Sequence, residues 1–242
     1  MIGEMVERAK LDSADIAEMY VLFTSHFERV SESRFREDLD NKDWVVRIRD
    51  ASTLVGFTSI RRMHVDVEGK GLDLIYSGDT IVKPQARSST LLARTWIESV
   101  RRISDLCPTS ELHWFLLVSG FRTYRLLPVF WKEFFPNYQV ETPASVRSTM
   151  DHVATRMFGA DYDQDKGVVR FKEPQPLRPE LAGIPESRLN DPHVRFFASV
   201  NSGHAEGDEL VCWTRLSKDN LTGAGARMWG AAQSVPAVTG SG

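Results

Sequence analysis

The sequence predicts an α/β (α+β) fold, in which helices flank a mixed, mostly antiparallel central sheet. Three observations indicate this class. Residues 12–27 and 88–103 place apolar side chains at helical spacing. Between residues 44 and 82, three runs with the short period of β-strands follow one another, separated by turns. A further apolar run at residues 112–118 has the length of a buried strand.

The first half of the chain is expected to form two helices and then three strands. The helix over residues 12–27 begins at Asp12 or Ser13, whose side chains are typical N-caps. A second helix covers residues 31–39. The strand-like runs cover residues 44–48, 53–64 and 72–82. The segment Ser77-Gly78-Asp79 interrupts the third run, and a glycine inside a strand is typical of a bulge or of a close approach by another group.

The second half of the chain alternates helices with short strands. A helix over residues 88–103 precedes the strand at 112–118, and a long aromatic helix over 121–135 ends at Pro136. Beyond it, helices are expected at residues 144–158, 194–200 and 220–229, and strands at 168–171 and 209–214.

The elements divide the chain into three parts. Residues 1–140 are expected to form the main domain, and residues 141–232 a small α/β C-terminal subdomain, extension or lid. The last residues, 233–242, consist of small residues and proline and are expected to be disordered.

Composition excludes several classes of protein. The formal net charge of −3 and a sequence pI near 6.1 argue against a nucleic-acid binder. Cys107 and Cys212 lack the spacing of a zinc site or disulfide framework, so two reduced, buried thiols are expected. The N-terminus carries no apolar signal segment, and no run approaches the roughly 18 apolar residues of a membrane span. A cytoplasmic protein that binds neither nucleic acid nor membrane is therefore expected.

One stretch carries most of the functional information. Residues 79–94 read as a strand, a connection beginning at Pro84, and a helix that opens with small residues. The free N–H groups and positive dipole end of such a helix favour an anion such as pyrophosphate. An ordinary N-capped helix without a ligand is the alternative.

This stretch resembles the acetyl-CoA signature of the GNAT superfamily, in which a strand ends in a V-x-P-x-x-R-G-x-G-x-G/A type loop. Arg87 takes the Arg/Gln position, Ser88 and Thr90 stand where the family prefers glycine, and Leu92 stands at the last Gly/Ala position. A second register begins at Gln85. The order of the predicted elements over residues 5–140 is also similar to that of a GNAT domain.

The resemblance implies an acyl-CoA as acyl donor, either acetyl-CoA or a longer acyl-CoA. In this family the signature strand splays from its neighbour and leaves backbone groups free for the pantetheine arm, while the loop amides hold the pyrophosphate. The residues expected at the donor on this basis are Ile81, Val82, Arg87, Ser88, Ser89, Thr90, Leu91, Leu92 and Ser119.

The resemblance also implies a catalytic acid, because the family commonly places a tyrosine on the helix after the last core strand. Tyr124 is the candidate, although a packing role fits it equally well, and an alternative alignment puts Trp131 there. Acyl transfer to an amine also needs a base, for which Asp79 is the first candidate. The further candidates for the base are Asp73, His64 and His113.

Two arginines and one loop complete the candidates. Arg122 and Arg125 are expected either to bind the donor or an acidic substrate, or to form a solvated helix face. Segment 201–209 is polar and contains two glycines, which is typical of a binding loop. An ordinary turn is the favoured interpretation.

The function expected from these features is N-acyl transfer from CoA, or from an acyl carrier protein, to an amine of a small molecule. A catalytically inactive GNAT-fold protein that binds acyl-CoA or a protein partner is the alternative. An unrelated α/β enzyme with another phosphate at the helix terminus is a third. A homodimer is allowed for, and the C-terminal region would then cover the acceptor site.

Overall fold

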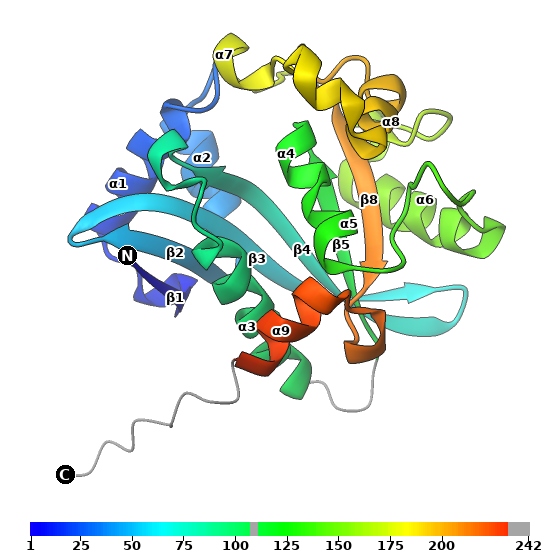
Figure 1. The fold of residues 1–242 in the computed structure, drawn as a ribbon, viewed down its shortest axis with the longest axis horizontal. Coiled ribbons are helices and arrows are strands. Elements are labelled where there is room, and N and C mark those ends of the chain that lie inside the picture. The colour runs from blue at the N-terminus through cyan, green and yellow to red at the C-terminus, as the bar shows by residue number, and fades with distance from the viewer. Residues whose placement is uncertain (107–110, 232–242) are drawn as a thin grey trace.

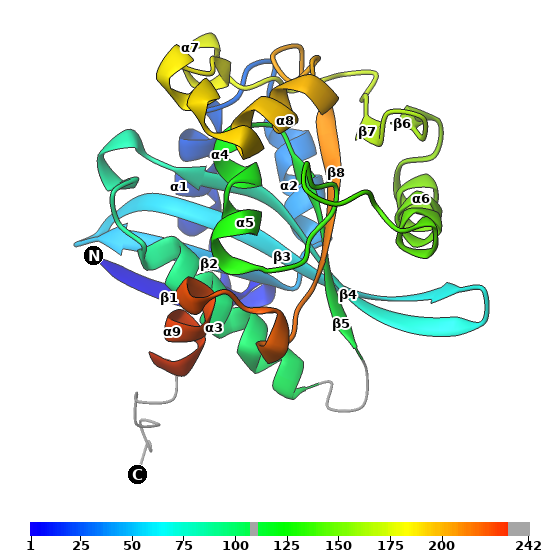
Figure 2. The same ribbon diagram turned by 45° about the vertical axis from the view of Figure 1, so that its right-hand side comes forward.

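The sheet of the protein has eight strands in the order β1-β2-β3-β4-β5-β8-β7-β6 (Figures 1 and 2). The computed structural model describes residues 1–106 and 111–231. Within them, β4 and β5 pair in parallel and every other neighbouring pair is antiparallel. The strands are β1 (Ile2–Glu7), β2 (Trp44–Asp50), β3 (Thr53–Val67), β4 (Lys70–Val82), β5 (Leu112–Val118), β6 (Tyr162–Asp163), β7 (Val168–Val169) and β8 (Glu209–Arg215).

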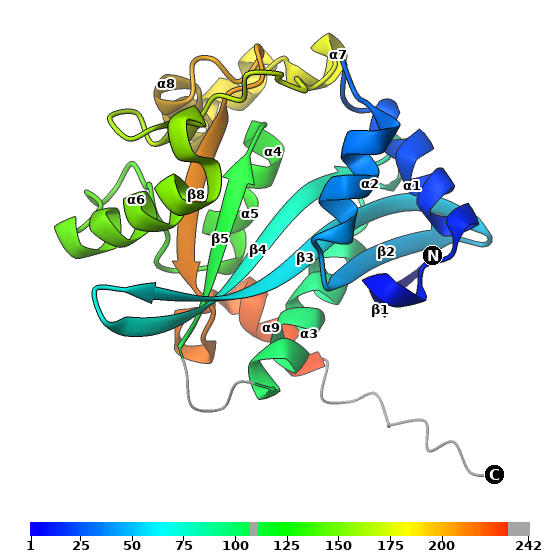
Figure 3. The same ribbon diagram turned by 180° about the vertical axis from the view of Figure 1, so that it is seen from behind.

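Helices cover both faces of this sheet. They are α1 (Ser13–Thr24), α2 (Glu32–Asp40), α3 (Leu91–Asp105), α4 (Phe121–Tyr124), α5 (Leu126–Phe130), α6 (Ala144–Phe158), α7 (Pro179–Ala182), α8 (Pro192–Val200) and α9 (Gly223–Ala231). In Figure 1, α3, α4, α5 and α9 lie in front of the sheet. Figure 3 shows α1, α2 and α6 on the opposite face. The mixed, mostly antiparallel sheet flanked by helices that the sequence predicts is confirmed.

The second face carries two separate cores. Phe23, Phe35 and Phe57 belong to the core under α1 and α2, whereas Phe115 and Val153 belong to the core under α6. The first face carries a single large core that joins α3, α5 and α9 to the sheet. The separation of α1 and α2 from α6 leaves the ends of β4 and β5 less covered on the second face.

Most predicted elements are confirmed, and two corrections follow from contacts distant in sequence. The predicted long helix over residues 121–135 is wrong: α4 and α5 are short, and the chain then becomes extended. Pro128 has no N–H to donate to the carbonyl of Tyr124, which interrupts a helix. Further on, Trp131 and Phe135 make β-bridges to the C-terminal part of the chain. Strand β1 is missing from the prediction because its charged, short sequence forms a strand only through pairing with β2.

The C-terminal part of the chain adds strands to the same sheet, since β8 pairs with β5 along its length. The division at residue 140 stays a prediction. Cys212 in β8 is buried and unpaired, whereas Cys107 and the predicted disordered tail lie outside the described residues. No helix among the described residues is long and apolar enough to cross a membrane.

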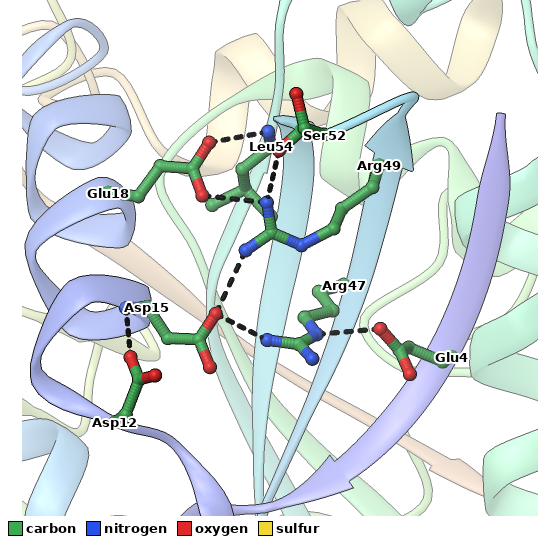
Figure 4. A network of polar contacts seen from close by, with 8 residues as sticks. All are labelled: Glu4, Asp12, Asp15, Glu18, Arg47, Arg49, Ser52 and Leu54. Carbon is green, nitrogen blue, oxygen red and sulfur yellow. Dashed lines mark hydrogen bonds and ion pairs between the residues drawn. The ribbon is translucent and has the colours of Figure 1, made fainter.

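A network of ion pairs fastens α1 to the sheet edge (Figure 4). Arg47 bridges Glu4 and Asp15 at 2.8 and 2.7 Å, so it joins β1 to α1. Arg49 contacts the same Asp15 oxygen at 2.9 Å and Glu18 at 2.8 Å. Burial raises the pKa of Asp15, but the hydrogen bonds and charges of the two arginines outweigh it, so the pKa is lowered.

Replacing Asp15 with alanine is expected to cost about 1–3 kcal/mol at pH 7, because two half-buried guanidinium groups lose a shared acceptor. The lowered pKa means that this contribution is present above the carboxyl's ordinary value and disappears as the pH falls through the lowered one. Urea unfolding at pH 7 and pH 3 measures the difference. Glu7→Gln, which removes the exposed pair of Glu7 with Lys10, should cost less than about 1 kcal/mol; equal losses would contradict the assigned role.

Candidate functional site

The centre of the sheet is split at the ends of β4 and β5. Their parallel pairing runs from Asp73 and Leu112 to Ser77 and Leu116 and then stops. β4 continues to Val82, and the two strands diverge (Figure 3). A register shift in the β3–β4 ladder accompanies the divergence. The predicted interruption of this strand is confirmed, and the last residues of β4 have no ladder partner on the β5 side.

Asp79 lies at this interruption with a φ of 52°. A non-glycine residue in the left-handed region is uncommon and costs of the order of 1 kcal/mol or more. The Oγ of Ser59, on β3, donates a hydrogen bond to its carboxylate at 3.4 Å. The strand therefore holds this carboxylate in an unusual direction at the point where the split opens.

A cavity of about 530 Å³ lies beside the split, on the face that carries α3 and α4. Seven of the predicted residues line it: Val82, Arg87, Ser89, Leu92, Ser119, Arg122 and Arg125. Ile81 instead packs in the core under α1 and α2. Ser88, Thr90 and Leu91 are not among the lining residues. The volume falls in the roughly 300–1,000 Å³ range of small-molecule sites.

The connection between β4 and α3 is a turn and not the start of a helix. A 3₁₀ turn covers Pro84–Ala86, and α3 begins at Leu91, three residues after the predicted start. The reason is local, because Ser89 Oγ accepts a hydrogen bond from the N–H of Leu91 at 3.1 Å, outside the helix. The first N–H groups of α3 have no acceptor within the helix, and Leu92 and Ala93 of this turn line the cavity.

The larger cavity is cationic. Its described lining contains four arginines and no carboxylate: Arg87, Arg122, Arg125 and Arg188. Arg125 forms an ion pair with Asp191 at 2.8 Å. The other three have no carboxylate partner among the described residues. Burial lowers the pKa of Arg122, and the charges of Arg87 and Arg188 lower it further. Guanidinium groups that repel one another favour a bound anion.

A connector, defined as residues 173–190, closes the open end of the split (Figure 1). It contains α7 and a 3₁₀ turn over Glu186–Asn190. The N–H of Arg178 donates to the carbonyl of His26 at 2.8 Å, and Arg122 donates to the carbonyl of Leu181 at 2.8 Å. A methyl group on Gly120 would lie 2.9 Å from Leu177, so the connector packs directly on the start of α4. It supplies part of the cavity wall.

A second cavity, of about 190 Å³, lies on the opposite face between α1 and α2 on one side and α6 on the other. Its walls combine aromatic rings with three carboxylates and one guanidinium group, that of Arg34. The aromatic residues are Phe23, Phe27, Phe35, Tyr76, Phe158 and Phe171. The carboxylates are those of Asp38, Asp79 and Glu209. The first predicted base therefore lies here and not in the cavity lined by the arginines.

Two of these carboxylates have strongly perturbed acidity. Burial, followed by the charge of Asp38, raises the pKa of Asp79 to about 7. Burial, followed by the charge of Asp79, raises the pKa of Glu209 to about 8. Asp38 differs, because it holds the ammonium group of Lys42 at 2.6 Å. Carboxylates whose pKa values lie near neutrality can exchange protons at physiological pH.

The two cavities meet at the split. Ser119, at the end of β5, lines the larger cavity and donates a hydrogen bond to Glu209, which lines the smaller one. Phe27 lines both. A cationic cavity on one face of the sheet thus adjoins an anionic cavity on the other, across the gap between β4 and β5.

The predicted acid does not reach either cavity. Tyr124 is fully buried, and its hydroxyl donates to the carbonyl of Pro136 at 2.8 Å. Its ring packs against Phe134 and Phe197. Burial raises the pKa of Tyr124 far above its ordinary value. The role of proton donor does not fit this placement, and Trp131 of the alternative alignment is equally buried.

The remaining candidates lie outside the site. Asp73 and His64 lie at the other end of β4, where their side chains are 3.4 Å apart, and His113 stacks on Trp213. The loop before β8 is held by internal contacts, since the Nδ1 of His204 donates a hydrogen bond to the carbonyl of Asn201 at 2.9 Å. The ordinary-turn interpretation of that loop fits the structure, apart from its last residue, Glu209.

Three site residues are absent from the prediction. Glu209 opens an apolar strand, but only the pairing of β8 with β5 brings it to the split. Arg188 reaches the larger cavity through the connector. His26 lines the same cavity with its Nε2 3.1 Å from the carbonyl of Val82, and burial lowers its pKa. A charged residue opening a buried strand is the one signal in the sequence that marks Glu209.

The parallel pair of β4 and β5, which are joined through α3 and diverge inside an otherwise antiparallel sheet, decides the fold class. The fold is GNAT-like. No protein-family model matches the chain, and a search of curated proteins finds no match. The fold assignment rests on this topology and on the split it creates.

Three solved structures are similar to part of the chain. A probable N-acyltransferase of unknown function from Enterococcus faecalis V583 is 14% identical with a TM-score of 0.43, over 55% of this chain and 33% of that one. The GNAT family N-acetyltransferase YhbS from Escherichia coli, in complex with CoA, is 16% identical with a TM-score of 0.38, over 51% and 67%. An acyl-CoA N-acyltransferase from Pseudomonas aeruginosa is 15% identical with a TM-score of 0.35, over 47% and 77%. The match thus spans one third of the Enterococcus protein.

Proposed function

We propose that the protein is an N-acyltransferase that moves an acetyl or longer acyl group from CoA to an amine of a small molecule. The observation that carries the proposal is the pair of oppositely charged cavities that meet where β4 and β5 diverge. Such an arrangement suits a polyanionic donor on one face and a cationic acceptor on the other. Acyl transfer requires the two to meet, and the split provides the place.

The larger cavity fits a CoA donor in charge, and its volume lies in the range of small-molecule sites. The phosphates would lie against Arg87, Arg122 and Arg188, with the free N–H groups at the start of α3 as further donors. The unpaired end of β4 leaves backbone groups for an amide-containing arm. An acyl-CoA supplies an acyl group that is already activated as a thioester. The protein has to position it, exclude water and handle one proton.

The smaller cavity would accept the proton that the amine has to lose before it attacks. An amine is protonated in water near neutral pH and attacks only after it loses a proton. Asp79, with a pKa of about 7, is ionised in a large fraction of molecules at neutral pH and can accept that proton. Glu209 lies in the same wall, and its pKa of about 8 leaves it mostly protonated at neutral pH until a cation binds beside it.

An acyl-CoA-binding protein without catalysis is the second candidate, and the burial of Tyr124 favours it, because no side chain then takes the predicted role of acid. An acyl carrier protein as donor is a further variant of the first proposal. Calorimetry with CoA, acetyl-CoA and a longer acyl-CoA separates these. A ligand present at 100 times its dissociation constant stabilises a protein by about 2.7 kcal/mol, so a thermal shift should accompany binding. Absence of both signals with every CoA species would overturn the CoA-dependent proposal.

A further inference from the structure

We propose that the smaller cavity is the acceptor site and that it selects a small primary amine carrying one apolar group, in preference to a polyamine or an amino acid. The inference rests on the proposed function and names its substrate class. It follows from the charge, the walls, the size and the position of this cavity.

The charge balance of the cavity calls for one cation. Lys42 neutralises Asp38, which it holds at 2.6 Å, and this ammonium group is itself almost fully buried. Asp79 and Glu209 have no ion-pair partner within 4 Å among the described residues, and the wall holds one further cation, the guanidinium group of Arg34. Three carboxylates thus face two cations, Lys42 and Arg34, which leaves one negative charge when all three carboxylates are ionised. Ionised carboxylates that are withdrawn from water are unfavourable unless a cation compensates them. A bound ammonium group would supply that cation.

The rest of the wall is suited to an apolar substituent. Rings from α1, α2, β4 and α6 surround the carboxylates, together with Phe171 and Leu117. Aromatic faces attract a cation and bury a neighbouring apolar group. A carboxylate on the substrate would add a negative charge beside Asp79 and Glu209, and a second ammonium group would exceed the one negative charge that Lys42 and Arg34 leave uncompensated.

An unused polar group supports the presence of a ligand. The Nε2 atom of Gln175, on the connector, is buried without a hydrogen-bond partner, and Gln175 lines this cavity. Buried polar groups in folded proteins are almost always satisfied, so an unpaired one calls for an explanation. At about 190 Å³ the cavity is smaller than the roughly 300–1,000 Å³ of drug-sized sites, which favours a small molecule.

The position of the cavity completes the case. Glu209 accepts a hydrogen bond from Ser119, which lines the donor cavity, so an amine held by Glu209 lies next to the split. Attack then forms a bond between the amine nitrogen and the acyl carbon, while the carbon–sulfur bond breaks. Asp79 takes one proton from the ammonium group before the attack. The second proton, which the nitrogen loses as the amide forms, passes to the departing thiolate, so the products are the N-acyl amine and CoA as a free thiol.

The test is calorimetric titration of the wild-type protein, with and without saturating CoA, using 2-phenylethylamine as the probe. Three analogues isolate each feature: 2-phenylethanol lacks the ammonium group, phenylalanine adds a carboxylate, and putrescine replaces the ring with a second ammonium group. Each analogue is expected to bind at least about tenfold more weakly than 2-phenylethylamine, because it loses a charge-assisted hydrogen bond or brings in an unpaired charge.

Variants locate the site. Glu209→Gln is expected to weaken 2-phenylethylamine about tenfold and to leave CoA binding unchanged. Glu206→Gln, an exposed acid in the preceding loop, is the matched control and should change neither. If 2-phenylethylamine does not bind with or without CoA, or if an analogue binds as tightly, the acceptor proposal is overturned. CoA binding in the same titrations shows separately whether the donor site stands.

Discussion

Replacing Asp79 with asparagine is expected to lower kcat by about 10²–10⁴-fold, the range that general acid–base catalysis contributes. The asparagine is close in size and can accept the hydrogen bond from Ser59, but it cannot take a proton at neutral pH. Steady-state rates with acetyl-CoA and an amine acceptor measure the effect. Because the variant removes proton transfer, kcat should fall much more than the KM of the amine rises.

The pH dependence of kcat/KM gives a second test of the role of Asp79. With a pKa of about 7, Asp79 is deprotonated only above that value, so kcat/KM of the wild type should rise with pH up to about 7 and then level off. The variant should lose that inflection. The groups that face Asp79, and whose own titration must be considered, are Asp38, Lys42, Tyr76 and Glu209. A retained inflection with a normal kcat would contradict the role of base.

A stability measurement separates this loss from unfolding. The pKa of Asp79 is raised in the folded state, so the folded protein binds more protons than the unfolded chain between about pH 4 and 7. Stability contributed by the protonated carboxyl is therefore lost as the pH rises through about 7. Asp79→Asn should be at least as stable as the wild type at pH 8, although it is far less active.

Replacing Arg188 with glutamate is expected to weaken CoA binding by about 10–100-fold, since a charged hydrogen bond contributes about 1.5–3 kcal/mol and its replacement by a like charge adds repulsion. The guanidinium group of Arg188 has no hydrogen-bond or ion-pair partner among the described residues, so the substitution should leave folding intact. The effect should shrink at high salt, because the interaction is between a partly exposed cation and a phosphate.

Calorimetry with CoA at low and high ionic strength measures this effect. Arg156→Glu, an exposed arginine on α6, is the matched control for the change in net charge. Arg122→Glu should weaken CoA binding as well, with an added loss of thermal stability, because Arg122 also holds the carbonyl of Leu181. If Arg188→Glu and Arg156→Glu bind CoA equally well, the arginines do not form the phosphate site.

Local pattern predicted much of the fold. Leu112–Val118 and Ala144–Phe158 have the predicted bounds, because each carries its own apolar pattern and is ended by its neighbours in sequence. The interruption at Gly78 was also predictable, since glycine inside a strand marks an irregularity. The Leu91 start of α3 differs from the prediction because Ser89 is used in the preceding turn.

The site depends on contacts that no local pattern contains. Glu209 reaches the split only because β8 pairs with β5, and Arg188 reaches the larger cavity only because the connector crosses from α1 to α4. Tyr124 points into the core because α4 ends after one turn, whereas a continuous helix was expected. Three of the four arginines of the larger cavity, and one of the three acids of the smaller cavity, were therefore predictable from the sequence.

The central claim is that donor and acceptor meet at the split, and free-thiol release tests it most directly. Wild-type protein is incubated with acetyl-CoA or a longer acyl-CoA and with 2-phenylethylamine, and the thiol is followed over time. The account predicts thiol release that requires both the amine and an ionised Asp79, with one acylated amine formed per thiol. Tight binding of CoA with no amine-dependent thiol release from any small primary amine would contradict it and identify a binding protein instead.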